Sequence, residues 1–280
     1  MIFDTFMYNG EEDILDIRLN TLGEIVDKFI ILESPRSHSL LPRELEYPKQ
    51  KERFEKFKDK ISYYSLDYCK SNNFVLNDWS GREVLENILI EKENLTTKDI
   101  IIHGDLDEIP RTNVLKDFIA SNSLLKPCTF MMDRRLLCLD LELSNIEHDR
   151  ARGNWFGLSL FLGAHLNKCK LHWLRQIRCN TIINGIDYKD CYTLVENAGW
   201  HFSYCAGLEK TIDKFKFFCH ANEMHNCVKD KEGLIQCIKN KHSFDPQKTQ
   251  LIKVEWNNQN IPEYVFNNSN LFKEILSFNY

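Results

Sequence analysis

The amino-acid sequence predicts an α/β fold with a Rossmann-like, mostly parallel sheet flanked by helices. Through the first third of the chain, runs of β-branched and aromatic residues alternate with single helical patterns, which indicates βαβ crossovers. The run at residues 100–102 is continuously apolar, as expected of a strand that is covered on both faces. With 280 residues, of which 43% are hydrophobic, the chain can bury one large core.

The expected elements of this sheet follow in chain order. Apolar residues at helical spacing, with three acids in the first turn, predict a helix over residues 9–27. Charged residues around Phe54 and Phe57 predict another helix over residues 49–60. The full series is strand 1–8, helix 9–27, strand 28–34, helix 49–60, strand 61–66, helix 81–95 and strand 100–102.

The alternation weakens after residue 121. Residues 129–143 predict one or two strands, residues 147–155 a polar loop, and an apolar stripe beginning at Leu208 predicts a further helix. The Asn-rich tail 246–280 is expected to be an irregular extension that closes with a short helix. We therefore predict one domain over residues 1–245, with the tail packed on the same domain.

Charge and cysteine content narrow the class of protein. A net charge of −5 and a pI near 6.0 argue against a nucleic-acid-binding protein. Asp4 interrupts the apolar start, and no apolar run is long enough for a membrane span, so we predict a cytoplasmic protein with reduced cysteines. The ten cysteines form no CxxC pair. Zinc binding by Cys219, His220, His225 and Cys227 is an alternative whose spacing fits no standard finger.

Three acids follow the apolar run 100–102, namely Asp105, Asp107 and Glu108. They fall at the carboxyl end of the predicted strand, where open α/β sheets bind ligands. In an extended segment the two aspartates point to the same side, roughly 6.6 Å apart along the chain. They could then share one Mn²⁺ or Mg²⁺, with a diphosphate in the other positions. Such acids are often a solvated turn, but the buried strand before them favours a metal site.

Other residues are expected at the same edge. Glu33 and the turn at Asn9 also follow strands, so three loops converge as in a nucleotide crevice, although neither GxGxxG nor a P-loop occurs. His201 is either a buried core residue or a metal ligand, and both interpretations stay open. Arg18 is expected to be a partly buried ion-pair partner for a strand-end acid. Diphosphate charge could be balanced by one or two of Arg175, Arg178, Lys210 and Lys214.

Three segments resemble the signature blocks of glycosyltransferase family 17, in the same order and across residues 2–223. They are DTFMYNGEEDILDIRLNTLGEIVDKFIILES, DIIIHGDLDEIP and AGWHFSYCAGLEKTIDKFKFFCH. The resemblance implies a GT-A type fold, a UDP-GlcNAc donor, a divalent metal, inversion at the anomeric carbon and a glycan acceptor, with β-1,4 transfer to mannose. Residues 1–120 would bind the nucleotide sugar, and residues 121–245 would face the acceptor.

The resemblance also assigns roles to residues. Inversion needs a general base for the acceptor hydroxyl, which we expect among Asp140, Glu142, Glu147 and Asp149, with Glu142 representing the group. Glu33 would bind the uridine ribose. We therefore predict Asp107, Glu108 and Glu142 as catalytic residues, Asn9, Glu33, Asp105, Arg175, Lys210 and Lys214 as donor-binding residues, and Asp105, Asp107 and His201 as metal ligands.

The sequence also departs from the family pattern. Residues 34–42 lack the glycine that usually follows the second strand, and Glu86 stands where the helix before the acids usually carries an arginine. These departures concern the acceptor more than the chemistry, and a cytoplasmic member would modify some other glycan than a lumenal one. The rival functions are a metal-dependent phosphohydrolase, a sugar nucleotidyltransferase and a non-catalytic glycan-binding protein.

Overall fold

The computed structural model describes residues 1–121, 124–144, 154–176, 182–183, 186–187 and 191–280. Within these ranges ten strands form one mixed sheet, in the order β12-β7-β6-β8-β4-β1-β2-β3, and β11 pairs with both β5 and β6. The strands are β1 (Ile2–Met7), β2 (Lys28–Glu33), β3 (Ile61–Ser65), β4 (Ile100–His103), β5 (Glu108–Pro110), β6 (Cys128–Leu136), β7 (Leu141–Leu143), β8 (Asn154–Leu162), β11 (Thr193–Ser203) and β12 (Leu251–Lys253). A separate pair consists of β9 (Ile182–Ile183) and β10 (Ile186–Asp187).

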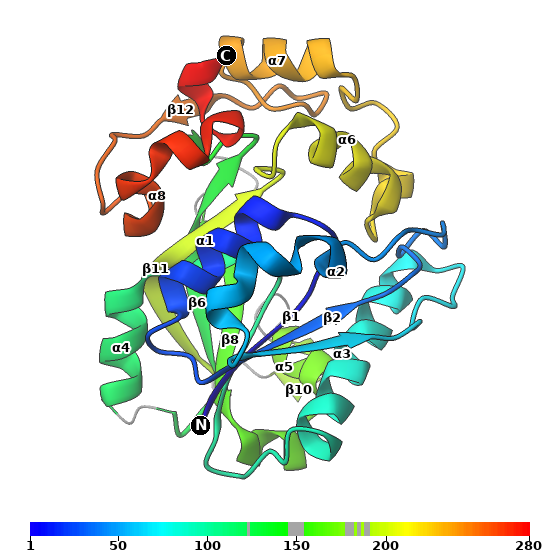
Figure 1. The fold of residues 1–280 in the computed structure, drawn as a ribbon, viewed down its shortest axis with the longest axis vertical. Coiled ribbons are helices and arrows are strands. Elements are labelled where there is room, and N and C mark those ends of the chain that lie inside the picture. Colours follow the sequence, from blue (N-terminus) through cyan, green and yellow to red (C-terminus); the bar gives the residue numbers. More distant parts are fainter. Residues whose placement is uncertain (122–123, 145–153, 177–181, 184–185, 188–190) are drawn as a thin grey trace.

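Helices cover both faces of the sheet (Figure 1). One face packs on α1 and α4, and the other packs on α3 and α5. The helices are α1 (Glu12–Leu22), α2 (Tyr47–Gln50), α3 (Phe74–Glu91), α4 (Thr112–Ala120), α5 (Leu171–Gln176), α6 (Leu208–Phe217), α7 (Lys231–Asn240) and α8 (Glu263–Asn267).

The first half of the sheet is parallel, as the alternating sequence pattern predicts. β3, β2, β1 and β4 pair in parallel, because a helical or looped crossover returns the chain to the same edge each time. Ile101 and Ile102 are fully buried and belong to the cores on opposite faces, which confirms a central strand. The predicted α/β class, with a sheet flanked by helices, is therefore confirmed.

The second half of the sheet is largely antiparallel. β8 pairs antiparallel with β4 and β6, and β7 pairs antiparallel with β6 and β12, whereas β11 runs parallel to β6. Only four residues separate β6 from β7, too few for a crossover, so this connection has to reverse the chain. The full length of β11 was not predicted as a strand, because the polar residues Glu196 and Asn197 interrupt its apolar positions.

Three further expectations are corrected in detail. The predicted helix 49–60 is the short α2 followed by a 3-10 helix, Lys51–Phe57, which still buries Phe54. Helix α3 begins seven residues before the predicted start, where the Asn73 side chain accepts a hydrogen bond from the Val75 amide at 3.1 Å. The tail contributes a strand, β12, to the sheet and buries Val265 and Ile275 in the core.

Within the described ranges, no helix is both long and apolar enough to cross a lipid bilayer. The cysteines of these ranges are free thiols, and several, including Cys128 and Cys205, are buried in the core.

His38 lies in the connection between β2 and α2 and is only 8% exposed. Its carbonyl oxygen accepts a hydrogen bond from Asn77 Nδ2 at 2.7 Å, which ties this connection to α3. Burial lowers the pKa of the imidazole, and Arg82 and Arg43 lower it further, although Asp78 opposes them. Folded His38 is therefore neutral at a pH where the unfolded chain already binds a proton.

This burial predicts a pH effect on stability. Below the ordinary pKa of 6.5, proton uptake favours the unfolded chain, so the free energy of unfolding falls as the pH falls. His38→Leu is expected to reduce that slope by up to about 1.4 kcal/mol per pH unit in this range. Urea unfolding between pH 7 and pH 5 measures it, with His220→Leu at an exposed position as the control. Equal slopes for His38→Leu and the unaltered protein would contradict the prediction.

Candidate functional site

Asp105 and Asp107 lie in the turn between β4 and β5 at the carboxyl edge of the sheet, and Glu108 is the first residue of β5. This acidic turn, residues 104–108, is closed by a hydrogen bond from the Asp105 amide to Glu108 Oε2 at 3.0 Å. The Asp105 side chain is 39% exposed, the Asp107 side chain 10%, and that of Glu108 is fully buried. The location at the strand end matches the sequence prediction, but the extended conformation assumed for it does not occur.

Arg18 binds the backbone of the acidic turn. Its Nη1 donates hydrogen bonds to the carbonyl oxygens of Asp105, Leu106 and Glu108 at 3.0, 3.1 and 2.7 Å. Its Nε and Nη2 form a paired contact with both carboxylate oxygens of Asp4 at 2.8 and 2.7 Å. Both side chains are fully buried. The expected partly buried pair with a strand-end acid is therefore corrected, because Asp4 lies within β1 and faces α1.

Two arginines bind the first aspartate and the glutamate of the turn. Arg82 Nη2 lies 2.9 Å from Asp105 Oδ1, and Arg175 forms an ion pair with Asp105 Oδ2. Arg175 also donates to Glu108 Oε2 at 2.8 Å and to Oε1 at 3.0 Å. Burial disfavours the charge of Arg175, but Asp105 and Glu108 outweigh burial and raise its pKa. We call Asp105, Glu108, Arg82 and Arg175 the Asp105 cluster.

His103 supports the Asp105 cluster from β4. Arg82 Nη1 lies 3.0 Å from His103 Nε2, so this ring nitrogen accepts the hydrogen bond. The proton then resides on Nδ1, which lies 2.9 Å from Thr5 Oγ1 and 3.2 Å from the Thr5 carbonyl oxygen. Burial, followed by the charge of Arg82, lowers the pKa of His103 well below its usual value, which keeps the ring neutral.

Asp107 points to a different set of partners. Its Oδ2 lies 2.9 Å from Lys214 Nζ, and its Oδ1 lies 3.6 Å from His201 Nε2. The His201 ring stacks on Trp155 at 4.6 Å between centroids, and Trp155 Nε1 donates to Glu108 Oε1 at 2.6 Å. Burial lowers the pKa of His201, although Asp107 opposes this, so the neutral ring is favoured. We call Asp107, His201 and Lys214 the Asp107 cluster.

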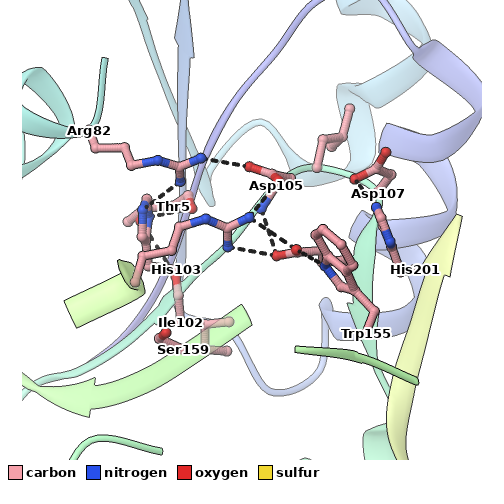
Figure 2. A network of polar contacts seen from close by, with 12 residues as sticks. Thr5, Arg82, Ile102, His103, Asp105, Asp107, Trp155, Ser159 and His201 are labelled. Atoms are coloured by element: carbon pink, nitrogen blue, oxygen red, sulfur yellow. Dashed lines mark hydrogen bonds and ion pairs between the residues drawn. The ribbon is translucent and has the colours of Figure 1, made fainter. Parts of the chain in front are cut away.

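The two aspartate carboxylates therefore point apart. Figure 2 shows Asp105 directed toward Arg82 and Asp107 directed toward His201, with the turn between them. The prediction that both point to one side fails because it assumed strand geometry. Once Arg18 takes three carbonyl oxygens of the turn, consecutive side chains no longer alternate as they do in a strand.

An open cleft lies beside the Asp107 cluster. Three predicted donor-binding residues, Asn9, Lys210 and Lys214, line it together with Arg43. A smaller hollow shares Lys210 and Lys214 with the cleft and reaches Asp107. The space thus extends from the turn after β1 to the second aspartate. The full lining of the cleft is Asn9, Glu11, Arg43, Glu44, Glu46, Lys210, Asp213, Lys214, Phe217 and Phe218.

Glu33, predicted to bind the ribose, is fully buried at the end of β2. Its carboxylate accepts hydrogen bonds from Arg43 Nη2 at 2.8 Å and Tyr63 Oη at 2.9 Å. The amides of Glu46 and Tyr47 add bonds of 2.7 and 3.1 Å. Glu33 therefore fixes the segment that carries Arg43 to the cleft, and ribose binding by Glu33 itself stays a prediction.

Asp140 and Glu142, the two predicted base candidates that the structure describes, do not join either cluster. Glu142 forms an ion pair with Arg135, and the strand register places this pair on the sheet face opposite His201. Asp140 is fully buried and accepts hydrogen bonds from the Ser277 amide and hydroxyl at 2.8 and 2.6 Å, so it anchors the tail. Glu147, Asp149 and Arg178 lie outside the described residues.

The match to a known protein family lies in the N-terminal part of the chain. The family model described as "Glycosyltransferase family 17" matches residues 1–147, which is more than half of the chain. This chain belongs to glycosyltransferase family 17. The family 17 match includes β1, the Asp4–Arg18 pair, Arg82 and the acidic turn, whereas Arg175, His201 and Lys214 lie beyond its end.

Two similar proteins are the beta-1,4-mannosyl-glycoprotein 4-beta-N-acetylglucosaminyltransferases of Homo sapiens and Rattus norvegicus. Each is 26% identical over 141 residues, which is 48% of this chain and 26% of the relative. The chain thus spans about a quarter of the length of these relatives. Among solved structures, a 4-diphosphocytidyl-2C-methyl-D-erythritol synthase aligns with a TM-score of 0.40 and 12% identity, over 62% of this chain and 83% of that one.

The family resemblance implies a divalent cation, and the site fits it in part. Asp107 and neutral His201 offer an oxygen and a nitrogen 3.6 Å apart beside the cleft. Mg²⁺-type sites commonly use one or two protein ligands plus phosphate oxygens and waters. Asp105 does not fit, because two arginines bind its carboxylate. Across the described part of the chain, no three His, Cys, Asp or Glu side chains gather around one possible ion position. This also applies to Cys219, His220, His225 and Cys227, the residues of the zinc alternative.

Sequence reasoning missed Arg82, Trp155, Arg43 and the role of Asp4. A signal for Arg82 existed, since Asp78 and Arg82 are spaced as an ion pair on one helix face, and Nη2 lies 2.9 Å from Asp78 Oδ1. Arg82 also stands one turn before Glu86, where family 17 members were expected to carry an arginine. Glu86 instead accepts hydrogen bonds from Lys170 Nζ at 2.8 Å and the Leu171 amide at 2.7 Å, which anchors α5.

Proposed function

We propose that this chain is a metal-dependent, inverting glycosyltransferase. It would transfer GlcNAc from UDP-GlcNAc to a glycan hydroxyl, in β-1,4 linkage to mannose by analogy with the names of its relatives. The observation that carries the proposal is the cleft, which leads from the basic residues Arg43, Lys210 and Lys214 to Asp107 beside His201.

The cleft suits a nucleoside diphosphate. Arg43, Lys210 and Lys214 supply positive charge for phosphate oxygens, and Phe217 and Phe218 supply an apolar wall for a base. Asp107 and His201 would hold Mn²⁺ or Mg²⁺, which when bound stabilises negative charge on the leaving diphosphate. The Asp105 cluster, with buried Glu108 at its centre, would keep Asp107 in place rather than touch the sugar.

The acceptor side needs a general base. A carboxylate opposite the leaving group would take the proton of the attacking hydroxyl. Asp140 is unsuitable, because the tail covers it. Glu142, Glu147 and Asp149 remain the proposed candidates, and the pairing of Glu142 with Arg135 leaves its side chain 41% exposed.

Incubation with several nucleotide sugars, Mn²⁺ and mannose-containing oligosaccharides tests the proposal. UDP release that depends on the sugar of the donor and on the acceptor is expected, and NMR of the product should show an inverted anomeric centre. A phosphohydrolase would release phosphate from any donor, and a nucleotidyltransferase would require a sugar phosphate and a nucleoside triphosphate. Glycan binding without any UDP release would identify a non-catalytic binding protein and overturn the proposal.

A further inference from the structure

We propose that Lys214 occupies the cation position at Asp107 in the free protein, so that a divalent cation enters together with a nucleotide diphosphate. The inference rests on the proposed function, because it concerns the cleft assigned there to the donor. In this arrangement the diphosphate binds the ammonium group of Lys214. The cation then occupies the position on Asp107 that the ammonium group has left.

The contacts of the Asp107 cluster carry this inference. Lys214 Nζ lies 2.9 Å from Asp107 Oδ2, while His201 Nε2 lies 3.6 Å from the other carboxylate oxygen. A cation ligated by Asp107 and His201 would therefore lie next to the ammonium group. The Asp107 side chain is only 10% exposed, so water screens repulsion between two such cations weakly. Lysine and a divalent cation thus exclude each other while Lys214 keeps this position.

The Lys214 side chain also has room to move from Asp107 toward the cleft. Its side chain is 25% exposed and lines both the cleft and the hollow that reaches Asp107. The ammonium group sits on a flexible four-carbon stem, so it can turn toward a diphosphate in the cleft. Glu11, whose Oε1 lies 3.8 Å from Nζ, lines the cleft as well as the hollow.

The affinities for the cation and for the diphosphate should therefore depend on each other. If the diphosphate draws Lys214 away from Asp107, it raises the affinity for the cation, and the cation must raise the affinity for the diphosphate by the same factor. The cation bound without nucleotide would have to displace a close ion pair, so its affinity in the free protein is low.

Manganese binding, followed by electron paramagnetic resonance and calorimetry with and without UDP, tests the inference. Lys214→Met is expected to bind Mn²⁺ alone about tenfold more tightly than the unaltered protein, and UDP should then enhance Mn²⁺ binding much less. Lys210→Met is the matched control, because Lys210 lines the same cleft one turn earlier on α6 but pairs with Glu12 at 3.3 Å. It should keep the low affinity for Mn²⁺ alone.

Lys214→Arg preserves the charge and is expected to keep the weak Mn²⁺ binding, which separates the effect of charge from any loss of packing. Equal affinities of Lys214→Met and the unaltered protein for Mn²⁺ alone would overturn the inference, even if sugar transfer is observed. Tighter binding in Lys214→Met without any sugar transfer would support the inference and count against the proposed function only.

Discussion

Asp107→Asn is expected to leave the protein folded and to lower metal-dependent sugar transfer by roughly a hundredfold or more. Asp107 is the acid that both borders the cleft hollow and lies beside His201. Under the proposed function, loss of its charge would remove the main ligand of a cation that stabilises the transition state by several kcal/mol, and about 2.7 kcal/mol corresponds to a hundredfold. Steady-state turnover at saturating donor and Mn²⁺ measures the effect, and circular dichroism checks the fold.

Asp105→Asn provides the comparison for that result. Asp105 is bound by Arg82 and Arg175, so its loss should disturb the Asp105 cluster while leaving UDP-linked Mn²⁺ affinity close to that of the unaltered protein. Full activity of Asp107→Asn at saturating donor would refute the role of Asp107. Loss of Mn²⁺ binding in Asp105→Asn but not in Asp107→Asn would show that the first aspartate is the ligand.

Arg18→Met is expected to lower the free energy of unfolding by about 3–5 kcal/mol, because it leaves the charge of Asp4 buried and unpaired. Three carbonyl oxygens of the acidic turn also lose their donor. Urea unfolding at pH 7 measures the change. Any protein that still folds should bind UDP and Mn²⁺ more weakly, because the turn that carries Asp107 is no longer held.

A double variant, Asp4→Leu with Arg18→Met, separates the two parts of this effect. Replacing both members of a buried ion pair by apolar residues is often nearly neutral, so much of the lost stability should return. The weaker binding of UDP and Mn²⁺ should remain, since the carbonyl oxygens of the turn still have no donor from Arg18. A double variant as unstable as Arg18→Met would show that the charge of Asp4 is not the main cause.

The sequence predicted the parts of this molecule that depend on local patterns. The apolar run 100–102 identified a buried strand, and that strand places Asp105 at the carboxyl edge of the parallel part of the sheet. The same reasoning placed Asn9 at this edge, and it lines the cleft. Such inferences succeed because strand direction and sheet edge follow from neighbouring residues alone.

The directions of the site side chains depend on residues distant in sequence, and there the predictions were weaker. Asp105 and Asp107 diverge because Arg18, about 90 residues away, holds the carbonyl oxygens of their turn. Arg175 neutralises Asp105 and Glu108 rather than lining the cleft, because α5 is anchored by Glu86 on α3. No local sequence pattern predicts contacts between residues so distant in the chain.

Strand β11 has a mechanical consequence. It pairs with β5, directly after the acidic turn, and with β6 in the second half of the sheet, and it places His201 opposite both Glu108 and Arg134. The backbone hydrogen bonds of β11 thus connect the two halves of the sheet. Rotation of one half of the sheet relative to the other would break these hydrogen bonds, so we expect rearrangements on ligand binding to involve peripheral segments and long side chains.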